Sequence, residues 1–309
     1  RDACLVHHRG EQSSTLLDAR MRCLQQRRGA LASAVRLLSG RSDSPFDAAQ
    51  VVARLPALAP CSDVGFVMAE VAIPEDPVLA TAVAAAEERV TEARTRFHGG
   101  DLSGAERIAE AAVAEARRLE FKPLLAEALL ALGTIEMSGP KASEATGHLE
   151  EATAVAVATH HDAVAAETFA RRIFVEAMAN STPTDVLLAQ VPLARAFAQR
   201  LPEPASALAR ASSNEGTVHL ARADRTRAAE AFGRAVAESD HAIDVDPIER
   251  SNYLQYLAYA TDDPQQRDSL FARSEAGLLA VLGLDHPLVL QRRLVRAWLM
   301  SDLKTSGAL

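Results

Sequence analysis

The chain has 309 residues, a formal net charge of −8, and a composition that is 48% hydrophobic but only 4% aromatic. A chain of this length can bury a core without metal or disulfide cross-links. Its acidity argues against a nucleic-acid-binding surface, which needs a basic stripe to neutralise phosphates. No apolar run approaches the ~18 residues of a membrane-spanning helix, so no membrane contact is expected. Alanine and leucine dominate the apolar residues, and both favour helices, so the composition predicts an all-α fold.

One basic cluster lies near the start of the chain and consists of Arg20, Arg22, Arg27 and Arg28. A solvated helix face explains it better than a nucleic-acid patch, because the chain as a whole is acidic. The chain also begins without an initiator methionine, inside what looks like a helix. We therefore interpret it as a fragment of a longer protein with no nucleic-acid partner.

The first long helix is predicted over residues 13–38, where apolar residues recur with helical periodicity. Ser44 and Pro45 suit the N-cap and the first position of the next helix, which is expected to end near residue 55. The periodicity is then interrupted by Pro56, Pro60, Pro74 and Pro77. The sequence therefore predicts an N-terminal helical segment over 1–76 and a second region over 77–309.

Turn signals recur in this second region at a spacing of about 40 residues. They are His98-Gly99-Gly100-Asp101, Ser138-Gly139-Pro140, Asn180-Ser181-Thr182-Pro183, Arg222-Ala223-Asp224 and Thr261-Asp262-Asp263-Pro264. Two helical segments fit within each interval, which is typical of a helical solenoid. The pattern predicts about five helix pairs followed by a terminal helix, with Pro192 inside a helix of the third pair.

Small and large residues alternate along these helix pairs, as helices that cross closely require. The clearest copies contain Leu129, Leu132, Gly133, Gly139, Ala145, Leu149 and Ala152, then Gly216, Ala228, Phe232 and Ala235, and also Ala93, Gly100, Ala105 and Ala112. This order resembles the tetratricopeptide repeat, and the Leu-Gly-Leu-Asp-His-Pro junction at 282–287 is similar to one in kinesin light chains. The resemblance implies an all-α, right-handed α-solenoid of tetratricopeptide-like helical hairpins.

A second resemblance is carried by residues of the N-terminal segment. They are Ala3-Cys4, Arg9-Gly10-Glu11-Gln12-Ser13, Leu16-Leu17-Asp18, Arg20-Met21, Cys23-Leu24, Leu55-Pro56, Leu58 and Cys61-Ser62-Asp63-Val64. This stretch resembles large myxobacterial serine/threonine protein kinases, in which tetratricopeptide repeats follow the kinase domain. The chain contains no glycine-rich phosphate loop, His-Arg-Asp loop or Asp-Phe-Gly motif. The resemblance therefore implies a regulatory or sensor region without kinase activity of its own.

The three cysteines, Cys4, Cys23 and Cys61, form neither a CxxC pair nor a zinc pattern with histidine. They are interpreted either as buried free thiols or as one disulfide of unknown pairing, with the third thiol left over. In many kinases of the family that the chain resembles, a membrane span separates the kinase from this region. The region is therefore expected to be either cytoplasmic or extracytoplasmic, and the second placement would make a disulfide reasonable.

No residue pattern predicts catalysis or metal binding. His7-His8 and His160-His161 are adjacent pairs, whose side chains on a helix diverge by about 100°, so neither pair can chelate a metal alone. Acidic doublets occur at Glu87-Glu88, Glu150-Glu151 and Asp262-Asp263, and are typical of helix ends and solvated faces. No serine lies in a Gly-x-Ser-x-Gly turn. We therefore expect no enzyme activity, no cofactor and no metal.

In a tetratricopeptide superhelix, the first helix of each pair lines a concave groove whose exposed side chains select the ligand. Consensus positions place on that face Arg210, Asn214 and Thr217 in one repeat and Asn252, Gln255, Tyr256 and Tyr259 in the next. Asparagine can hydrogen-bond an extended peptide backbone, and tyrosine adds rigid apolar area with a polar tip. However, core packing explains the stripe Tyr253, Tyr256 and Tyr259 as well as display on the groove does.

Three functions follow as hypotheses. The first is a scaffold or sensor that binds a protein or peptide in the groove. The second is a helical domain that senses a small-molecule ligand between its helices. The third is a dimerisation module that brings kinase domains together. An exposed polar and aromatic track around Asn214 and Tyr256 would favour the first, and a closed apolar pocket would favour the second.

Overall fold

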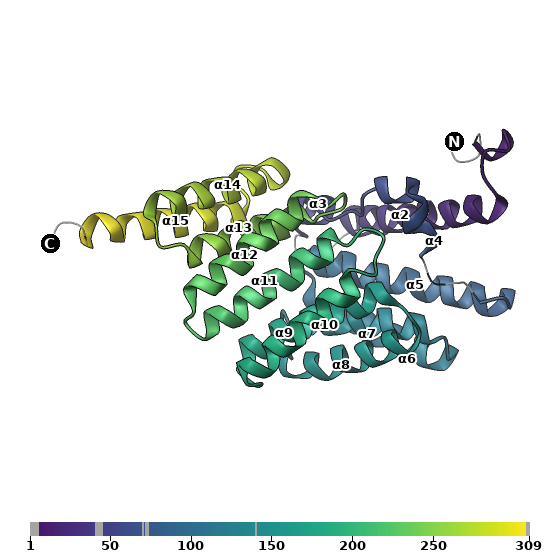
Figure 1. Ribbon diagram of the computed structural model, residues 1–309. Helices are drawn as coiled ribbons and strands as arrows, with labels where there is room; N and C mark the ends of the chain where they lie inside the picture. Colours follow the sequence, from purple (N-terminus) through teal and green to yellow (C-terminus); the bar gives the residue numbers. More distant parts are fainter. Residues whose placement is uncertain (1–5, 41–45, 70, 72–73, 140, 307–309) are drawn as a thin grey trace. The chain divides into compact units, whose positions relative to one another are not determined.

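The computed structural model describes residues 6–40, 46–69, 71, 74–139 and 141–306, and every regular element in these ranges is a helix (Figure 1). The predicted all-α class is therefore confirmed. Among the described helices, none is both long enough and apolar enough to cross a lipid bilayer.

The N-terminal helices are α2 (Ser14–Ser39), α3 (Ala48–Ala53), the short 3-10 helix η1 (Ala59–Ser62) and α4 (Val64–Met68). Helix α2 begins where predicted, because the Ser13 side chain accepts a hydrogen bond from the backbone N–H of Leu16 at 3.2 Å. The next helix is present and ends at Ala53, near the predicted end, but its predicted start was wrong. Asp47 is its N-cap, and its carboxylate accepts from the N–H of Gln50 at 2.9 Å, whereas Ser44 and Pro45 lie outside the described residues.

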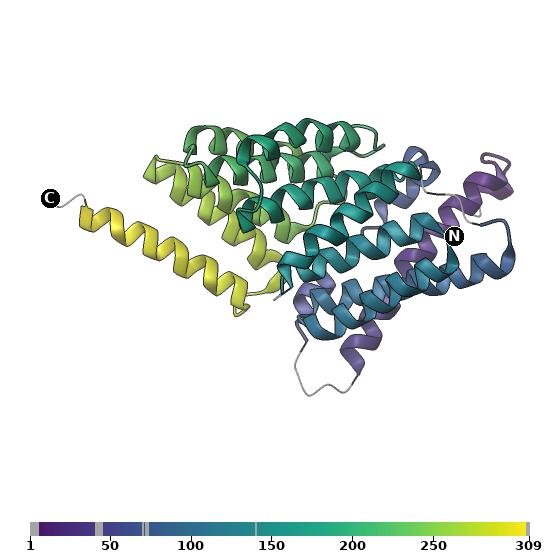
Figure 2. The ribbon, with the colours of Figure 1, turned by 90° about the horizontal axis from the view of Figure 1, so that it is seen from below.

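Eleven longer helices follow in the described ranges. They are α5 (Pro77–His98), α6 (Leu102–Leu119), α7 (Lys122–Glu136), α8 (Ala142–Ala158), α9 (Asp162–Ala179), α10 (Thr184–Ala198), α11 (Ala205–Ala221), α12 (Arg225–Asp240), α13 (Pro247–Ala260), α14 (Pro264–Leu282) and α15 (Pro287–Ser306). Consecutive helices pack as pairs, α5 with α6, α7 with α8, α11 with α12 and α13 with α14 (Figures 1 and 2). Each predicted turn falls between two consecutive helices.

By its internal contacts the chain divides into two compact units, one of Arg1–Arg172 with Ala196–Pro204 and one of Ile173–Arg195 with Ala205–Leu309. In the first unit, α2 packs against α5, and the backbone N–H of Asp47 donates to the carbonyl of Gly99 at 3.0 Å. These units divide within α9 and α10, and the separate segment predicted over 1–76 stays a prediction.

Alanine supplies much of the core, because it lets helix backbones approach closely. Ala93, Ala105 and Ala112 have no exposed surface in the first unit, and Ala228 and Ala235 have none in the second. Glycine likewise allows close packing on the first helix of two pairs, α7 and α11. A Cβ on Gly133 would lie 2.8 Å from the Leu149 side chain, and one on Gly216 would lie 2.6 Å from the Phe232 ring. In these two pairs the predicted small residue therefore packs against the predicted large one.

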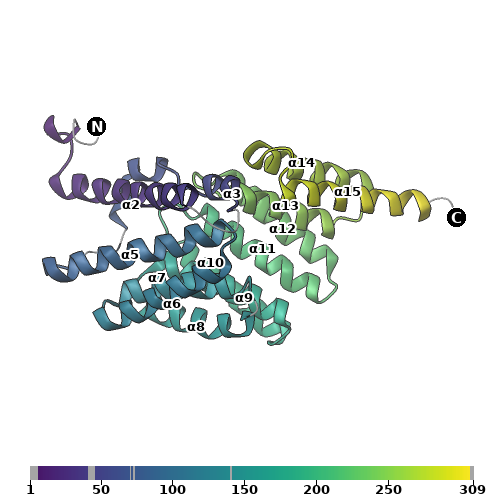
Figure 3. The ribbon, with the colours of Figure 1, turned by 180° about the vertical axis from the view of Figure 1, so that it is seen from behind.

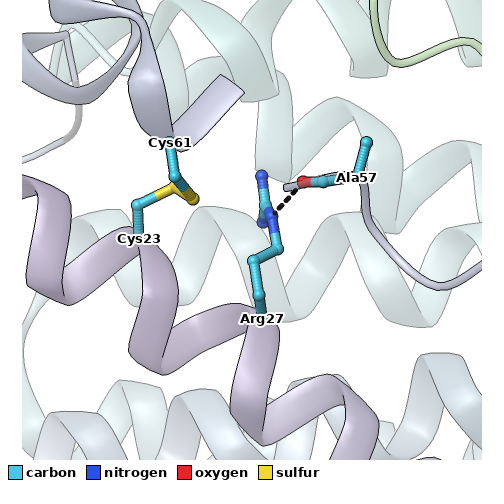
Figure 4. Close-up of a disulfide and its surroundings, with 4 residues drawn as sticks. All are labelled: Cys23, Arg27, Ala57 and Cys61. Carbon is cyan, nitrogen blue, oxygen red and sulfur yellow. Dashed lines mark hydrogen bonds between the residues drawn. A yellow bond between two sulfur atoms is a disulfide. The ribbon is translucent and has the colours of Figure 1, made fainter. Parts of the chain in front are cut away.

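A disulfide joins Cys23 of α2 to Cys61 of η1 (Figure 4). Both cysteines are buried, in a small cluster with Ala19 and Val67. Of the two interpretations of the cysteines, the disulfide is therefore correct for Cys23 and Cys61. Cys4 lies outside the described residues. The bond fixes the chain after α3 to the side of α2.

The basic cluster of α2 also holds the chain that follows α3 against α2. Arg27 donates to the carbonyl of Ala57 at 2.9 Å (Figure 4). Arg20 and Arg22 donate to the carbonyls of Ser62 and Val71 at 3.2 and 3.0 Å. The expectation of a merely solvated face was wrong, because these three guanidinium groups hold backbone carbonyls that no helix satisfies.

Candidate binding surface

The predicted groove residues of the second unit lie on α11 and α13, the first helices of their pairs. Beside them, the terminal helix α15 carries a residue that was not predicted. Figure 3 shows α13, α14 and α15 beside one another in that unit. Helix α11 contacts α13, and a side-chain hydrogen bond joins α13 to α15. We call the side of these helices that carries Arg210, Asn252, Tyr256 and Arg292 the α11–α13–α15 face.

Arg210 on α11 is neutralised by its own chain. Its guanidinium lies 2.6 Å from the carboxylate of Glu249 on α13, which also accepts a hydrogen bond from the Tyr253 hydroxyl at 3.3 Å. Burial by itself lowers the pKa of Arg210, but the charge and hydrogen bond of Glu249, together with Tyr253 and Asp246, outweigh burial and raise the pKa above its ordinary value. The predicted groove arginine is therefore part of an ion pair between two helices.

Of the other predicted residues of α11, Asn214 is buried and Thr217 is half-buried. Asn214 is only 7% exposed, and the Thr217 hydroxyl donates to the backbone carbonyl of Ser213 at 3.2 Å. The expectation that Asn214 stands exposed on a track was wrong. Consensus positions define the direction of a side chain, whereas its depth depends on how closely the next helix packs.

The residues of α13 form the polar and aromatic part of the face. Asn252, Gln255, Tyr256 and Tyr259 are all half-buried, whereas Tyr253 is 5% exposed and belongs to the core. The Tyr256 ring packs on Phe232 at 5.6 Å between ring centroids. The tyrosine stripe therefore divides, with one ring in the core and two at the surface.

Two contacts order this part of the face. Gln255 donates to the Tyr259 hydroxyl at 2.7 Å, and the Tyr259 ring meets Phe271 edge-on at 5.5 Å. Burial raises the pKa of Tyr256, so its hydroxyl stays a neutral hydrogen-bonding group over a wide pH range.

Sequence reasoning missed Arg292 on α15. Its Nη2 donates to the Asn252 side-chain oxygen at 3.0 Å, and the residue is 6% exposed. The two residues are 40 positions apart, the interval at which the turn signals recur. That interval could have pointed to Arg292, because it places the arginine one repeat after Asn252.

The first unit carries a different charged cluster on its first helices, which sequence reasoning also missed. His161, immediately before α9, donates from Nε2 to the Glu127 carboxylate of α7 at 3.0 Å. Arg94 of α5 and Arg171 of α9 act electrostatically on the same cluster. Burial raises the pKa of Glu127, but the His161 hydrogen bond and the charge of Arg94 outweigh it and hold the pKa below 4.5. His160 and His161 lie between the end of α8 and the start of α9.

Glu136 has the opposite shift. Its side chain is buried between α7 and α8, where its carboxylate meets Nδ1 of His148 at 2.7 Å. Burial raises the pKa of Glu136 above 4.5 although the His148 hydrogen bond opposes the shift, and the nearby Glu144 and Glu106 raise it further. The pKa values of two carboxylates of one helix are thus shifted in opposite directions.

The two glutamates should therefore shape opposite sides of the pH–stability profile. The stabilisation from Glu127 is fully present above 4.5 and is lost as the pH falls through its lowered pKa. The stabilisation linked to Glu136 is present below 4.5 and is lost as the pH rises through its raised pKa. The free energy of unfolding is measured against pH by urea unfolding followed by circular dichroism. Glu127→Gln should reduce its pH dependence only below 4.5, and Glu136→Gln only above 4.5. Glu150→Gln, an exposed site on α8, is the matched control. If Glu127→Gln and Glu136→Gln changed the pH dependence over the same pH range, the assignment would be contradicted.

Within the residues that the structure describes, no three His, Cys, Asp or Glu side chains gather as a metal-binding group would require.

Comparison with known proteins gives the fold. No protein-family model and no curated protein sequence matches the chain. The crystal structure of BtubC (BKLC) from P. vanneervenii is similar, with a TM-score of 0.53 and 20% identity over 69% of this chain and 85% of that chain. Two structures of a Podosopora anserina protein, described as a putative kinesin light chain with nearly identical TPR-like repeats, have TM-scores of 0.48 and 0.47. They are 17% and 16% identical over 64% of this chain and 96% and 97% of theirs.

At these identities the likeness concerns the fold alone. Together with the packing of consecutive helices in pairs, the BtubC match confirms the predicted fold class, an all-α solenoid of tetratricopeptide-like hairpins.

Proposed function

We propose that this chain is a non-catalytic scaffold that binds a protein or an extended peptide along the α11–α13–α15 face. The main support is that Asn252, Tyr256 and Tyr259 are only partly buried on α13, whereas Tyr253 of the same helix is in the core. Rigid aromatic rings beside amide groups are suited to peptide recognition, since they offer apolar area and backbone hydrogen bonds at a low cost in conformational entropy.

We also propose that the scaffold is the regulatory or sensor region of a serine/threonine protein kinase. The segment Arg9-Gly10-Glu11-Gln12-Ser13 supports this through its resemblance to myxobacterial kinases. The reading frame upstream of Arg1 should then encode a glycine-rich loop, a His-Arg-Asp loop and an Asp-Phe-Gly motif. The Cys23–Cys61 disulfide favours the extracytoplasmic side of such a kinase, and thiol alkylation of the protein in intact cells would test that placement.

A capture experiment tests the scaffold function. Immobilised wild-type protein is incubated with native lysate beside Tyr256→Ala and Arg273→Ala, the second being an exposed site on α14. We expect one partner to be lost with Tyr256→Ala and retained with Arg273→Ala, as measured by quantitative mass spectrometry. Circular dichroism verifies that both variants are folded. Equal capture by the two variants would exclude this face, and a catalytic turnover abolished by a point substitution would overturn the non-catalytic assignment.

A further inference from the structure

Arg292 is a buried cation with no carboxylate partner among the described residues. It is 6% exposed, its Nη2 donates to the neutral Asn252 amide at 3.0 Å, and its Nη1 is buried with no hydrogen-bond acceptor among the described residues. Its electrostatic neighbours are the phenols of Tyr256 and Tyr259. Because an unpaired buried charge is unfavourable, this arrangement needs a reason.

Other arginines near Arg292 are compensated by carboxylates. Arg210 pairs with Glu249 at 2.6 Å. On α15 itself, Arg296 pairs with Asp268 at 2.6 Å and Arg293 pairs with Glu275. The chain therefore has carboxylates for these arginines but none within ion-pairing distance of Arg292 in the part that the structure describes. The α11–α13–α15 face keeps one positive charge uncompensated.

Two neutral donors stand beside this charge. Arginine can only donate, so its hydrogen bond fixes the Asn252 oxygen toward it and leaves the amide N–H groups to donate elsewhere. Tyr256 lies four residues after Asn252 on the same side of α13, and the structure shows no hydrogen bond from its hydroxyl among the described residues. Both side chains are half-buried. The Asn252 amide N–H groups and the Tyr256 hydroxyl are therefore donors without acceptors among the described residues.

We propose that Arg292, Asn252 and Tyr256 form a binding site for a carboxylate of an acidic peptide segment. The half-buried Asn252 and Tyr256 donate hydrogen bonds directly to the carboxylate, and the buried guanidinium of Arg292 supplies the charge, which acts strongly because it is shielded from water. One positive charge with two neutral donors matches a monoanion, and a phosphate dianion would lack a second cation. This inference rests on the proposed function and adds the chemistry of the ligand.

Three acetylated peptides test the site at constant ionic strength by isothermal titration calorimetry. They are hexaglutamate amide, hexaglutamine free acid and hexaglutamine amide. We expect the wild-type protein to bind at least one carboxylate-bearing peptide ~tenfold or more tightly than hexaglutamine amide. A preference for hexaglutamate amide assigns the site to side-chain carboxylates, and a preference for the free acid assigns it to a chain terminus.

Variants then locate the effect. Arg292→Gln should abolish the preference, whereas Arg273→Gln, which removes the same charge from an exposed site on α14, should keep it. Tyr256→Phe keeps the ring on Phe232 and removes only the hydroxyl, so about a threefold loss is expected even if Arg292→Gln fails to fold.

Two results would overturn the carboxylate site. One is a wild-type protein with no preference for either carboxylate-bearing peptide, and the other is an equal loss in Arg292→Gln and Arg273→Gln. Either result, combined with capture of a partner that depends on Tyr256, would leave the scaffold function intact. Failure of both experiments would remove the function together with the ligand.

Discussion

Replacing Cys23 and Cys61 together with serine is expected to lower the free energy of unfolding of the first unit by about 4 kcal/mol. The bond joins residues 38 positions apart, and a closed loop of that size restricts the unfolded chain considerably. The segment it holds also contains the carbonyls of Ala57 and Ser62, which accept from Arg27 and Arg20. Urea unfolding followed by circular dichroism measures the change.

Reduction supplies the control for this experiment. Wild-type protein treated with a phosphine reductant should unfold at the same urea concentration as the double-serine variant, because both lack the bond. The variant itself should not respond to the reductant. If the oxidised, reduced and variant proteins all unfold together, the disulfide does not stabilise the fold and the arginine–carbonyl contacts suffice.

Gly216→Ala is expected to destabilise the second unit by about 1–3 kcal/mol. The added Cβ would lie 2.6 Å from the Phe232 ring, and that ring cannot move easily because it has no exposed surface. Alanine is otherwise the better helix former by about 1 kcal/mol, so steric overlap must outweigh a local gain. The thermal midpoint and the urea midpoint should both fall.

Gly233→Ala on α12 is the matched control, since a Cβ there would meet nothing within 4 Å. It should stabilise the protein by about 1 kcal/mol, which is a change of opposite sign. A double-mutant cycle tests the cause, because Phe232→Leu makes room and should reduce the cost of Gly216→Ala. A cost that is unchanged in the Phe232→Leu background would show that the ring is not responsible.

The helices and turns could be predicted because their signals are local. Asp224, Asp263 and Pro264 lie at the starts of helices, where a carboxylate accepts backbone N–H groups and proline loses no hydrogen bond. Gly216 and Phe232 could be recognised as a packing pair because a close crossing tolerates few other residues there. In each case neighbours in the sequence determine the result.

The rest of the binding surface depends on neighbours far along the chain. Asn214 is buried, and Arg210 is neutralised by a glutamate 39 residues away. Three cysteines allow three pairings, and only the fold of η1 against α2 selects Cys23 with Cys61. The 40-residue interval points to the position of Arg292 but not to its unusual property, which is the absence of a carboxylate around it among the described residues.

The contacts of α15 have a consequence for the motions of the chain. Among the described elements, its main packing partner is α14, and it meets α13 through Arg292 and Asn252. A helix held mainly on one side opens at a lower free energy than one enclosed by two neighbours, so its amide hydrogens exchange with solvent sooner. A ligand that compensates the charge of Arg292 would favour the closed state and slow that exchange. The last helix can thus report occupancy of the face through its own rate of opening.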